Sequence, residues 1–150
     1  ISFGPATLEP HHPDLFWYGI HATEVLFTAM GPGCERVTRT HTANTDVVTG
    51  VWSGDRVGTL HGLRGGRAEY GLTIFGSTAI AQGKPGSAYT MLLTEILTFF
   101  RTRVPPVSAA ETIEILAFME AADESKRRGG SPVSLREVLK ANGGSPDLLK

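Results

Sequence analysis

The chain has 150 residues, of which 41% are hydrophobic and 19% are charged. This length and composition are typical of one globular domain that needs neither a metal nor a disulfide to hold it together. Fourteen Lys and Arg residues against 15 Asp and Glu residues give a formal charge of −1, so no basic excess exists to bind a nucleic-acid backbone. No apolar run reaches the length of a membrane span. We therefore expect neither nucleic acid nor a membrane as a partner.

Cys34 is the single cysteine, which excludes an intrachain disulfide and a thiolate metal cluster. A lone cysteine is typical of a reducing compartment, so we expect a cytoplasmic protein with an inert thiol at this position. The chain starts at Ile1 rather than at Met. We interpret this start as a hint that the natural protein is longer.

The first thirty residues predict a strand, a loop and a helix. Residues 2–9 are compatible with one short strand. Pro10 and Pro13 stand too close together for regular structure, so an irregular loop should follow. Residues 15–30 predict a largely buried helix, with Asp14 as its N-cap.

Thr, Val and Gly dominate the next fifty residues, which predicts four or five strands in a largely antiparallel meander. The predicted strands are 35–42, 47–52, 57–63, 69–75 and 77–82. We place Thr38, Thr40, Thr42 and Trp52 on a sheet face that helices leave uncovered.

Three helices are expected in the last third of the chain. A Gly- and Pro-rich break at 83–87 precedes the first, at 88–103. Capping boxes at Ser108 and Ser134 open the others, which should end near Arg128 and Ala141.

Charge spacing on the second of these helices predicts the i,i+4 ion pairs Asp123–Arg127 and Glu124–Arg128. The basic run 126–128 should complement the helix dipole. The tail at 142–150 should be loose.

The element order therefore predicts an α+β domain spanning 1–150. We expect an open, largely antiparallel sheet of five or six strands, with helices on one face. The other face should serve for subunit packing, giving a homo-oligomer.

His21 is the strongest candidate for chemistry, because a half-buried histidine is suited to acid–base work near neutral pH. A structural histidine bonded to a backbone carbonyl is the alternative. His11 and His12 point apart in extended chain, so we expect them to line a binding cleft rather than hold a metal. His41 and His61 should lie on the sheet surface. The sequence holds no dinucleotide fingerprint and no nucleophile elbow.

Two stretches carry a family resemblance. One is Trp17-Tyr18-Gly19-Ile20-His21 with Glu24 and the apolar residues that follow, and the other runs from Pro106 to Ser125. Together with the element order they make the chain resemble the C-terminal domain of the Gfo/Idh/MocA oxidoreductases, such as glucose–fructose oxidoreductase and inositol 2-dehydrogenase. The resemblance covers nearly the whole chain.

This resemblance implies one half of a two-domain NAD(P)-dependent enzyme acting on a sugar- or polyol-like substrate. An N-terminal Rossmann domain, absent here, would bind NAD or NADP, so this chain alone would hold no cofactor and be inactive. His21 would be catalytic, transferring the proton of the substrate hydroxyl, and His11, His12, Trp17 and Tyr18 would bind substrate. The family often has Asp four residues before the histidine, where this sequence has Trp17, which can stack on a sugar-like ring.

Two other functions remain open at this point. One is a stand-alone α+β module that binds a small ligand or dimerises without redox activity. The other is a hydrolase or isomerase that pairs His21 with Asp14 or Glu24. The first predicts a stable ligand-binding dimer, and the second predicts activity from this chain alone.

Overall fold

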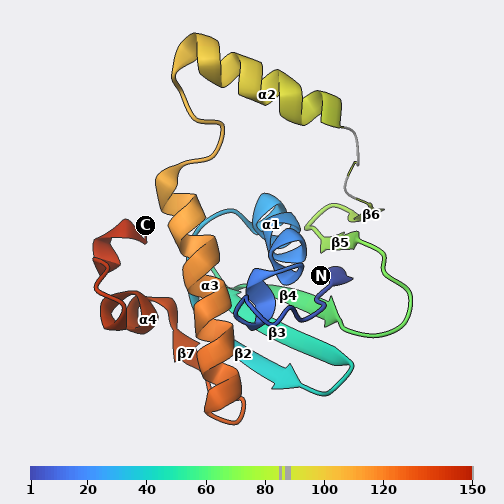
Figure 1. The fold of residues 1–150 in the computed structure, drawn as a ribbon, viewed down its shortest axis with the longest axis vertical. Helices are drawn as coiled ribbons and strands as arrows, with labels where there is room; N and C mark the ends of the chain where they lie inside the picture. Colours follow the sequence, from blue (N-terminus) through green and yellow to red (C-terminus); the bar gives the residue numbers. More distant parts are fainter. Residues whose placement is uncertain (85, 87–88, 150) are drawn as a thin grey trace.

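The computed structural model describes residues 1–84, 86 and 89–149, and it has the α+β fold that the sequence predicts (Figure 1). Seven strands form one open sheet in the order β6-β5-β1-β4-β3-β2-β7. This is more than the expected five or six strands, because the two-residue strand β7 adds to the edge beside β2. The strands are β1 (Ser2–Pro5), β2 (Cys34–His41), β3 (Thr45–Trp52), β4 (Arg56–Leu63), β5 (Gly71–Phe75), β6 (Ile80–Gly83) and β7 (Val133–Ser134).

Strand β1 lies inside the sheet although it comes first in the chain. It pairs in parallel with β4 and antiparallel with β5, whereas the other neighbouring strands pair antiparallel. The predicted meander is therefore correct for β2, β3 and β4, and β1 inserts between β4 and β5.

The helices are α1 (Gly19–Met30), α2 (Tyr89–Thr102), α3 (Ala109–Arg127) and α4 (Leu135–Ala141), with short 3₁₀ helices η1 (Asp14–Phe16) and η2 (Pro146–Leu148). Helix α1 packs on β1 and β4, and α3 packs on β2, on the same side of the sheet. Positions 85 and 87 of the predicted break and position 88 of the predicted helix lie outside the described residues.

The helix predicted at 15–30 is two pieces, because the chain turns between η1 and α1. Asp14 is not a helix cap, since no side-chain capping bond forms at the start of η1 and its carboxylate binds basic side chains instead. Gly31 ends α1 with a positive φ of 66°, and its N–H donates to the carbonyl of Phe27 at 2.7 Å.

An aromatic cluster fills the space between the sheet and the helices. The rings of Phe27, Trp52 and Phe118 meet with centroids 5.5 to 5.9 Å apart. Trp52 is 1% exposed, so its predicted place on the uncovered face is wrong. The strand alternates as expected, but Val47 and Thr49 face outward, which turns Trp52 inward.

The C-terminal helices begin where the sequence predicts. The Ser108 side chain accepts a hydrogen bond from the Glu111 N–H, which confirms the first cap. Ser134 precedes α4 but its side chain makes no capping bond. The described part of the tail, 142–149, is not loose, because Leu149 is buried and its carbonyl accepts a hydrogen bond from Arg136. Position 150 lies outside the described residues.

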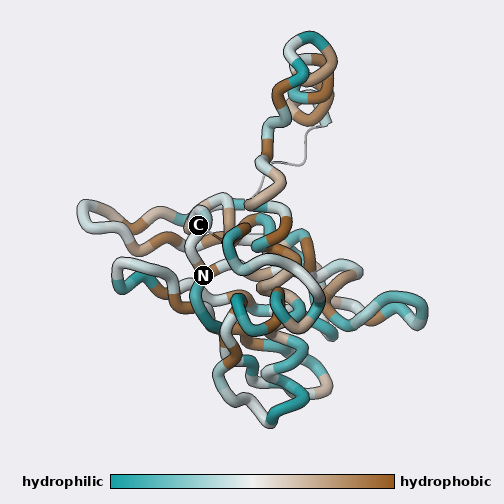
Figure 2. Tube along the Cα trace, turned by 90° about the vertical axis from the view of Figure 1, so that its left-hand side faces the viewer, coloured by the Kyte–Doolittle hydropathy of each residue, from teal (hydrophilic) through white to brown (hydrophobic). Residues whose placement is uncertain are grey.

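Helix α2 projects away from the body beyond the upper end of α3 (Figures 1 and 2). Every residue of α2 is exposed, although six of its nine positions from Leu92 to Phe100 carry large apolar side chains. Exposure extends through every described residue from 74 to 109. This end of the molecule thus leaves a large apolar surface in solvent.

Within the described part of the chain, none of the helices has both the length and the apolar character needed to cross a bilayer.

Candidate functional site

Most of the predicted site residues meet at the start of α1. The ring centroids of His12 and Trp17 lie 4.6 Å apart, those of Trp17 and Tyr18 5.7 Å, and those of Tyr18 and His21 5.9 Å. The series of neighbouring rings continues to Tyr70, whose ring centroid lies 6.3 Å from that of His21. We call these five residues the aromatic array.

His21 is the most accessible ionisable group of the array, and it is exposed rather than half-buried as the sequence predicts. Its side chain is 57% exposed, and its Nδ1 lies 3.3 Å from Oε2 of Glu24, one helical turn further on. The alternative of a histidine bonded to a backbone carbonyl does not match this geometry. A carboxylate at this position holds the ring and leaves Nε2 free for a ligand.

The loop before η1 places the other two histidines. Glu9 accepts from the backbone N–H of His11 at 2.8 Å and lies 2.6 Å from Nδ1 of His12. The hydrogen bond with His12 holds the pKa of Glu9 below its usual value. His11 thus lies in the same exposed loop as His12 but outside the array.

Tyr70 is a member of the array that sequence reasoning missed. It precedes β5 and reaches over β1, where a Cβ at Gly4 would come within 2.5 Å of its ring. Burial, with the nearby Tyr18 hydroxyl, raises the pKa of Tyr70. The glycine in β1 is the sequence signal, because it leaves room for an aromatic ring.

A cluster of six charged side chains lies behind the array, and we call it the ionic network. Its members are Arg39, Arg64, Lys126, Asp14, Asp46 and Asp123. Three positive and three negative groups balance, which is how charges are accommodated out of water.

Arg39 is the centre of the ionic network. Its side chain is fully buried, and its Nε donates to Oδ1 of Asp46 at 2.8 Å, while Nη2 donates to Oδ1 of Asp14 at 2.9 Å. Nη1 donates to Asp123 on α3. One guanidinium therefore joins β2, β3, η1 and α3.

Asp14 receives two further cations. Lys126 donates to its Oδ2 at 2.8 Å, and Arg64 donates to its Oδ1. Arg64 also donates to Asp46, and its Nη1 is buried with no partner among the described atoms. The network thus fastens η1 to the end of β4 and the last turn of α3.

The carboxylates of the network have very different proton affinities. Burial alone would raise the pKa of Asp14, but hydrogen bonds from Lys126, Arg39 and Arg64 outweigh it and hold that pKa far below its usual range. Burial and the charge of Asp14 raise the pKa of Asp123 to about 6, against the attraction of Arg39.

Asp46 behaves like Asp14. Burial opposes its ionisation, but its contacts with His41 at 2.7 Å and with Arg39 lower its pKa. His41 thus lies at the edge of the network on the helix-covered side, whereas the sequence predicts only a sheet-surface position. His61 lies on the uncovered face, as predicted.

Of the two ion pairs predicted on α3, one forms. Glu124 contacts Arg128 at 2.6 Å. Asp123 faces the core and binds Arg39 instead of Arg127, which pairs with Glu120 and Glu124.

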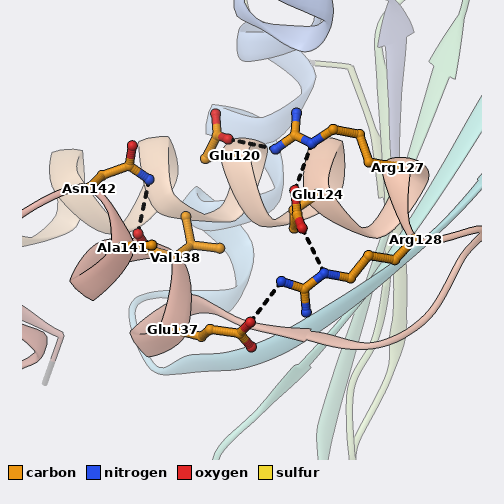
Figure 3. Close-up of a pocket in the computed structure, with 8 residues that line it drawn as sticks. All are labelled: Glu120, Glu124, Arg127, Arg128, Glu137, Val138, Ala141 and Asn142. Atoms are coloured by element: carbon orange, nitrogen blue, oxygen red, sulfur yellow. Dashed lines mark hydrogen bonds and ion pairs between the residues drawn. The ribbon is translucent and has the colours of Figure 1, made fainter.

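A surface pocket of about 280 Å³ lies between α3 and α4 (Figure 3). Its charged lining residues bind one another, with Arg127 on Glu120 and Glu124, and Arg128 on Glu124 and Glu137. The charges are already paired and exposed, so this pocket offers no free group to a ligand.

Cys34 is buried and free, as expected for an inert thiol. Burial and the neighbouring Glu114 carboxylate raise the pKa of the Cys34 thiol strongly. Glu114 in turn accepts the backbone N–H groups of Gly33 and Cys34, both at 2.7 Å, and burial raises its pKa. This carboxylate fixes the turn before β2.

Across residues 1–84, 86 and 89–149, no three His, Cys, Asp or Glu side chains are grouped to hold a metal ion. The three aspartates of the ionic network are bridged by guanidinium groups, which occupy the place of a cation.

The face of the sheet opposite α1 and α3 carries rows of Thr and Val. The central row is Thr38–Thr49–Thr59, in which each residue is half-buried and pairs directly across the strands. A second row runs from Val47 through His61 to Phe3. The expected threonines at 38 and 40 lie on this uncovered face, and Thr42 lies beyond the end of β2.

The sequence matches no family model and no curated protein.

Proposed function

We propose that the chain is the substrate-binding and oligomerisation domain of an NAD(P)-dependent oxidoreductase acting on a sugar- or polyol-like hydroxyl or carbonyl group. The observation that carries the proposal is His21, an accessible acid–base group set among aromatic rings. Aromatic faces bind the C–H surfaces of sugar rings, and an imidazole within reach of a hydroxyl can accept its proton.

The proposed division of labour is simple. A nicotinamide dinucleotide bound by a separate domain would supply the acceptor for the hydride of the carbinol carbon. His21 accepts the hydroxyl proton on Nε2, while Glu24 holds Nδ1 of the ring at 3.3 Å. Trp17 and Tyr18, which are 40% and 43% exposed, orient the substrate ring.

The exposed apolar end of the molecule supports a larger assembly. Soluble domains rarely leave a large apolar surface unpaired, and the described residues from 74 to 109 do so. A second domain would cover part of this surface.

The uncovered sheet face supports a homo-oligomer. Its Thr and Val rows are weakly polar, which suits isologous packing of two copies. Thr49 is central to this face, so Thr49→Arg should convert a dimer into a monomer in sedimentation. Thr112→Arg, on the exposed first turn of α3, is the matched control. A dimer that survives Thr49→Arg would contradict packing through this face.

The activity is tested in the complete protein that contains this chain. Reduction of NAD or NADP is measured with a panel of polyols and sugars. His21→Asn should lower kcat by about 10²- to 10⁴-fold while dinucleotide affinity stays unchanged. Thr28→Asn, further along α1, controls for damage to the helix.

Unchanged turnover in His21→Asn would refute the acid–base role. If no substrate supports reduction, the chain is instead a binding module without redox activity.

A further inference from the structure

Asp14 joins the two clusters of side chains described above. Its carboxylate belongs to the ionic network, and its position in the chain is three residues before Trp17. A contact in the buried network can therefore control where the aromatic array lies.

The intervening residues transmit this constraint. Leu15 is fully buried, and the N–H of Phe16 donates to the carbonyl of Pro13 at 2.8 Å. The ion pairs of Asp14 thus hold the first residue of η1, and the burial of Leu15 holds the second. Trp17 is the first side chain to leave the core, so its direction follows from these two anchors.

The three cations that bind Asp14 lie in the sheet, at the end of one of its strands and in α3. Arg39 is fully buried in β2, Arg64 is 5% exposed at the end of β4, and Lys126 lies in the last turn of α3. These three cations come from parts of the chain 25, 50 and 112 residues away from Asp14. Asp14 therefore ties a surface loop to the sheet and to α3 at once.

We propose that Asp14 is a positioning residue of the candidate site. Its ion pairs hold η1 so that Trp17 stacks on His12 and continues through Tyr18 to His21. The inference rests on the proposed function for what the site does, but the geometry that it claims is measured without any substrate.

Tryptophan fluorescence gives the test. The chain has two tryptophans, of which Trp52 is 1% exposed and Trp17 is 40% exposed, so acrylamide quenching reports on Trp17. Asp14→Asn should raise the quenching constant about twofold, because the indole would lose its stacking and move from 40% exposure toward full exposure. Asp14→Glu should restore part of the protection, since it keeps the charge.

The matched control is Asp55→Asn, an exposed aspartate in the turn between β3 and β4, which should leave quenching unchanged. If Asp14→Asn does not fold, Lys126→Gln weakens the same contact from a side chain that is 34% exposed. Its quenching constant should rise in the same direction.

A variant that melts earlier but keeps the quenching constant of the original chain would overturn the inference, because Asp14 would then stabilise the fold without positioning the array. This outcome is separate from the fate of the proposed function. Asp14→Asn can raise the quenching constant even if the protein reduces no dinucleotide. Conversely, activity can depend on His21 even if the exposure of Trp17 does not depend on Asp14.

Discussion

Arg39 and Asp46 lie side by side on β2 and β3, with Nε 2.8 Å from Oδ1 and both side chains fully shielded from solvent. Removing one partner of a buried pair leaves the other charge without compensation. Arg39→Met should therefore lower the free energy of unfolding by about 3–5 kcal/mol, measured by urea denaturation.

The control for this change is Arg36→Met on the same strand, because Arg36 is half-exposed and pairs only loosely with Glu35 at 3.9 Å. The double variant Arg39→Met, Asp46→Leu should lose less stability than the sum of the two single variants, because the two side chains share one direct contact. A small effect of Arg39→Met would mean that water reaches the network.

Asp123 gives a pH dependence whose sign is opposite to that of a usual salt-bridged aspartate. Its pKa is raised to about 6 in the folded chain from an ordinary value of 3.8. Its contribution to stability is therefore complete below pH 3.8 and is lost as the pH rises through about 6. The loss amounts to about 3 kcal/mol at neutral pH.

Asp123→Asn should remove this slope, and denaturation of both chains at pH values from 4 to 7 measures it. Asp14, whose pKa is depressed, contributes stability that is lost only at pH values below 3.8, so the two effects occupy separate ranges. Equal slopes in the two chains would show that Asp123 stays ionised beside Arg39.

Gly4 should be intolerant of any side chain. A Cβ at this position would meet two ring atoms of Tyr70 at 2.5 and 2.6 Å, so the ring must shift from its place beside His21. Gly4→Ala should cost about 1–3 kcal/mol and shift the histidine ring resonances in NMR spectra. Gly83→Ala, where an added Cβ meets nothing within 4 Å, is the control and should change neither property.

Helix α2 should tolerate polar substitutions that a core helix would not. Leu93→Gln and Ile96→Gln should each change the free energy of unfolding by less than about 0.5 kcal/mol, because α2 projects from the body. Urea denaturation measures both changes. In contrast, Leu26→Ala in α1 should cost about 2–5 kcal/mol. A large loss from Ile96→Gln would show that α2 packs on the body.

Local patterns predict the helices and most strands well, because hydrophobic period and capping residues act over a few positions. The end of α1 at Gly31 and the start of α3 at Ser108 are examples. The same patterns do not determine which alternate residues of a strand face the helices, so the sequence predicts the wrong face for Trp52.

Part of the candidate site can likewise be predicted from local sequence, and part cannot. His12, Trp17, Tyr18 and His21 are close in sequence, so their grouping follows from one loop and one helix. The ionic network does not, since its members meet only when β2, β4 and α3 are in place. Asp14 has the spacing of a helix cap, and only its distant partners reveal its actual contact.

The place of β1 in the sheet has a consequence for the order of folding. Residues 2–5 form the strand between the β5–β6 hairpin and the block of β4, β3 and β2. The register joins Ser2 to Leu60 on one side and to Leu72 on the other. Closing loops of this length is slow compared with forming adjacent hairpins. The chain should therefore assemble β2, β3 and β4 early and unite the two halves of its sheet late, when its first strand enters the gap between them.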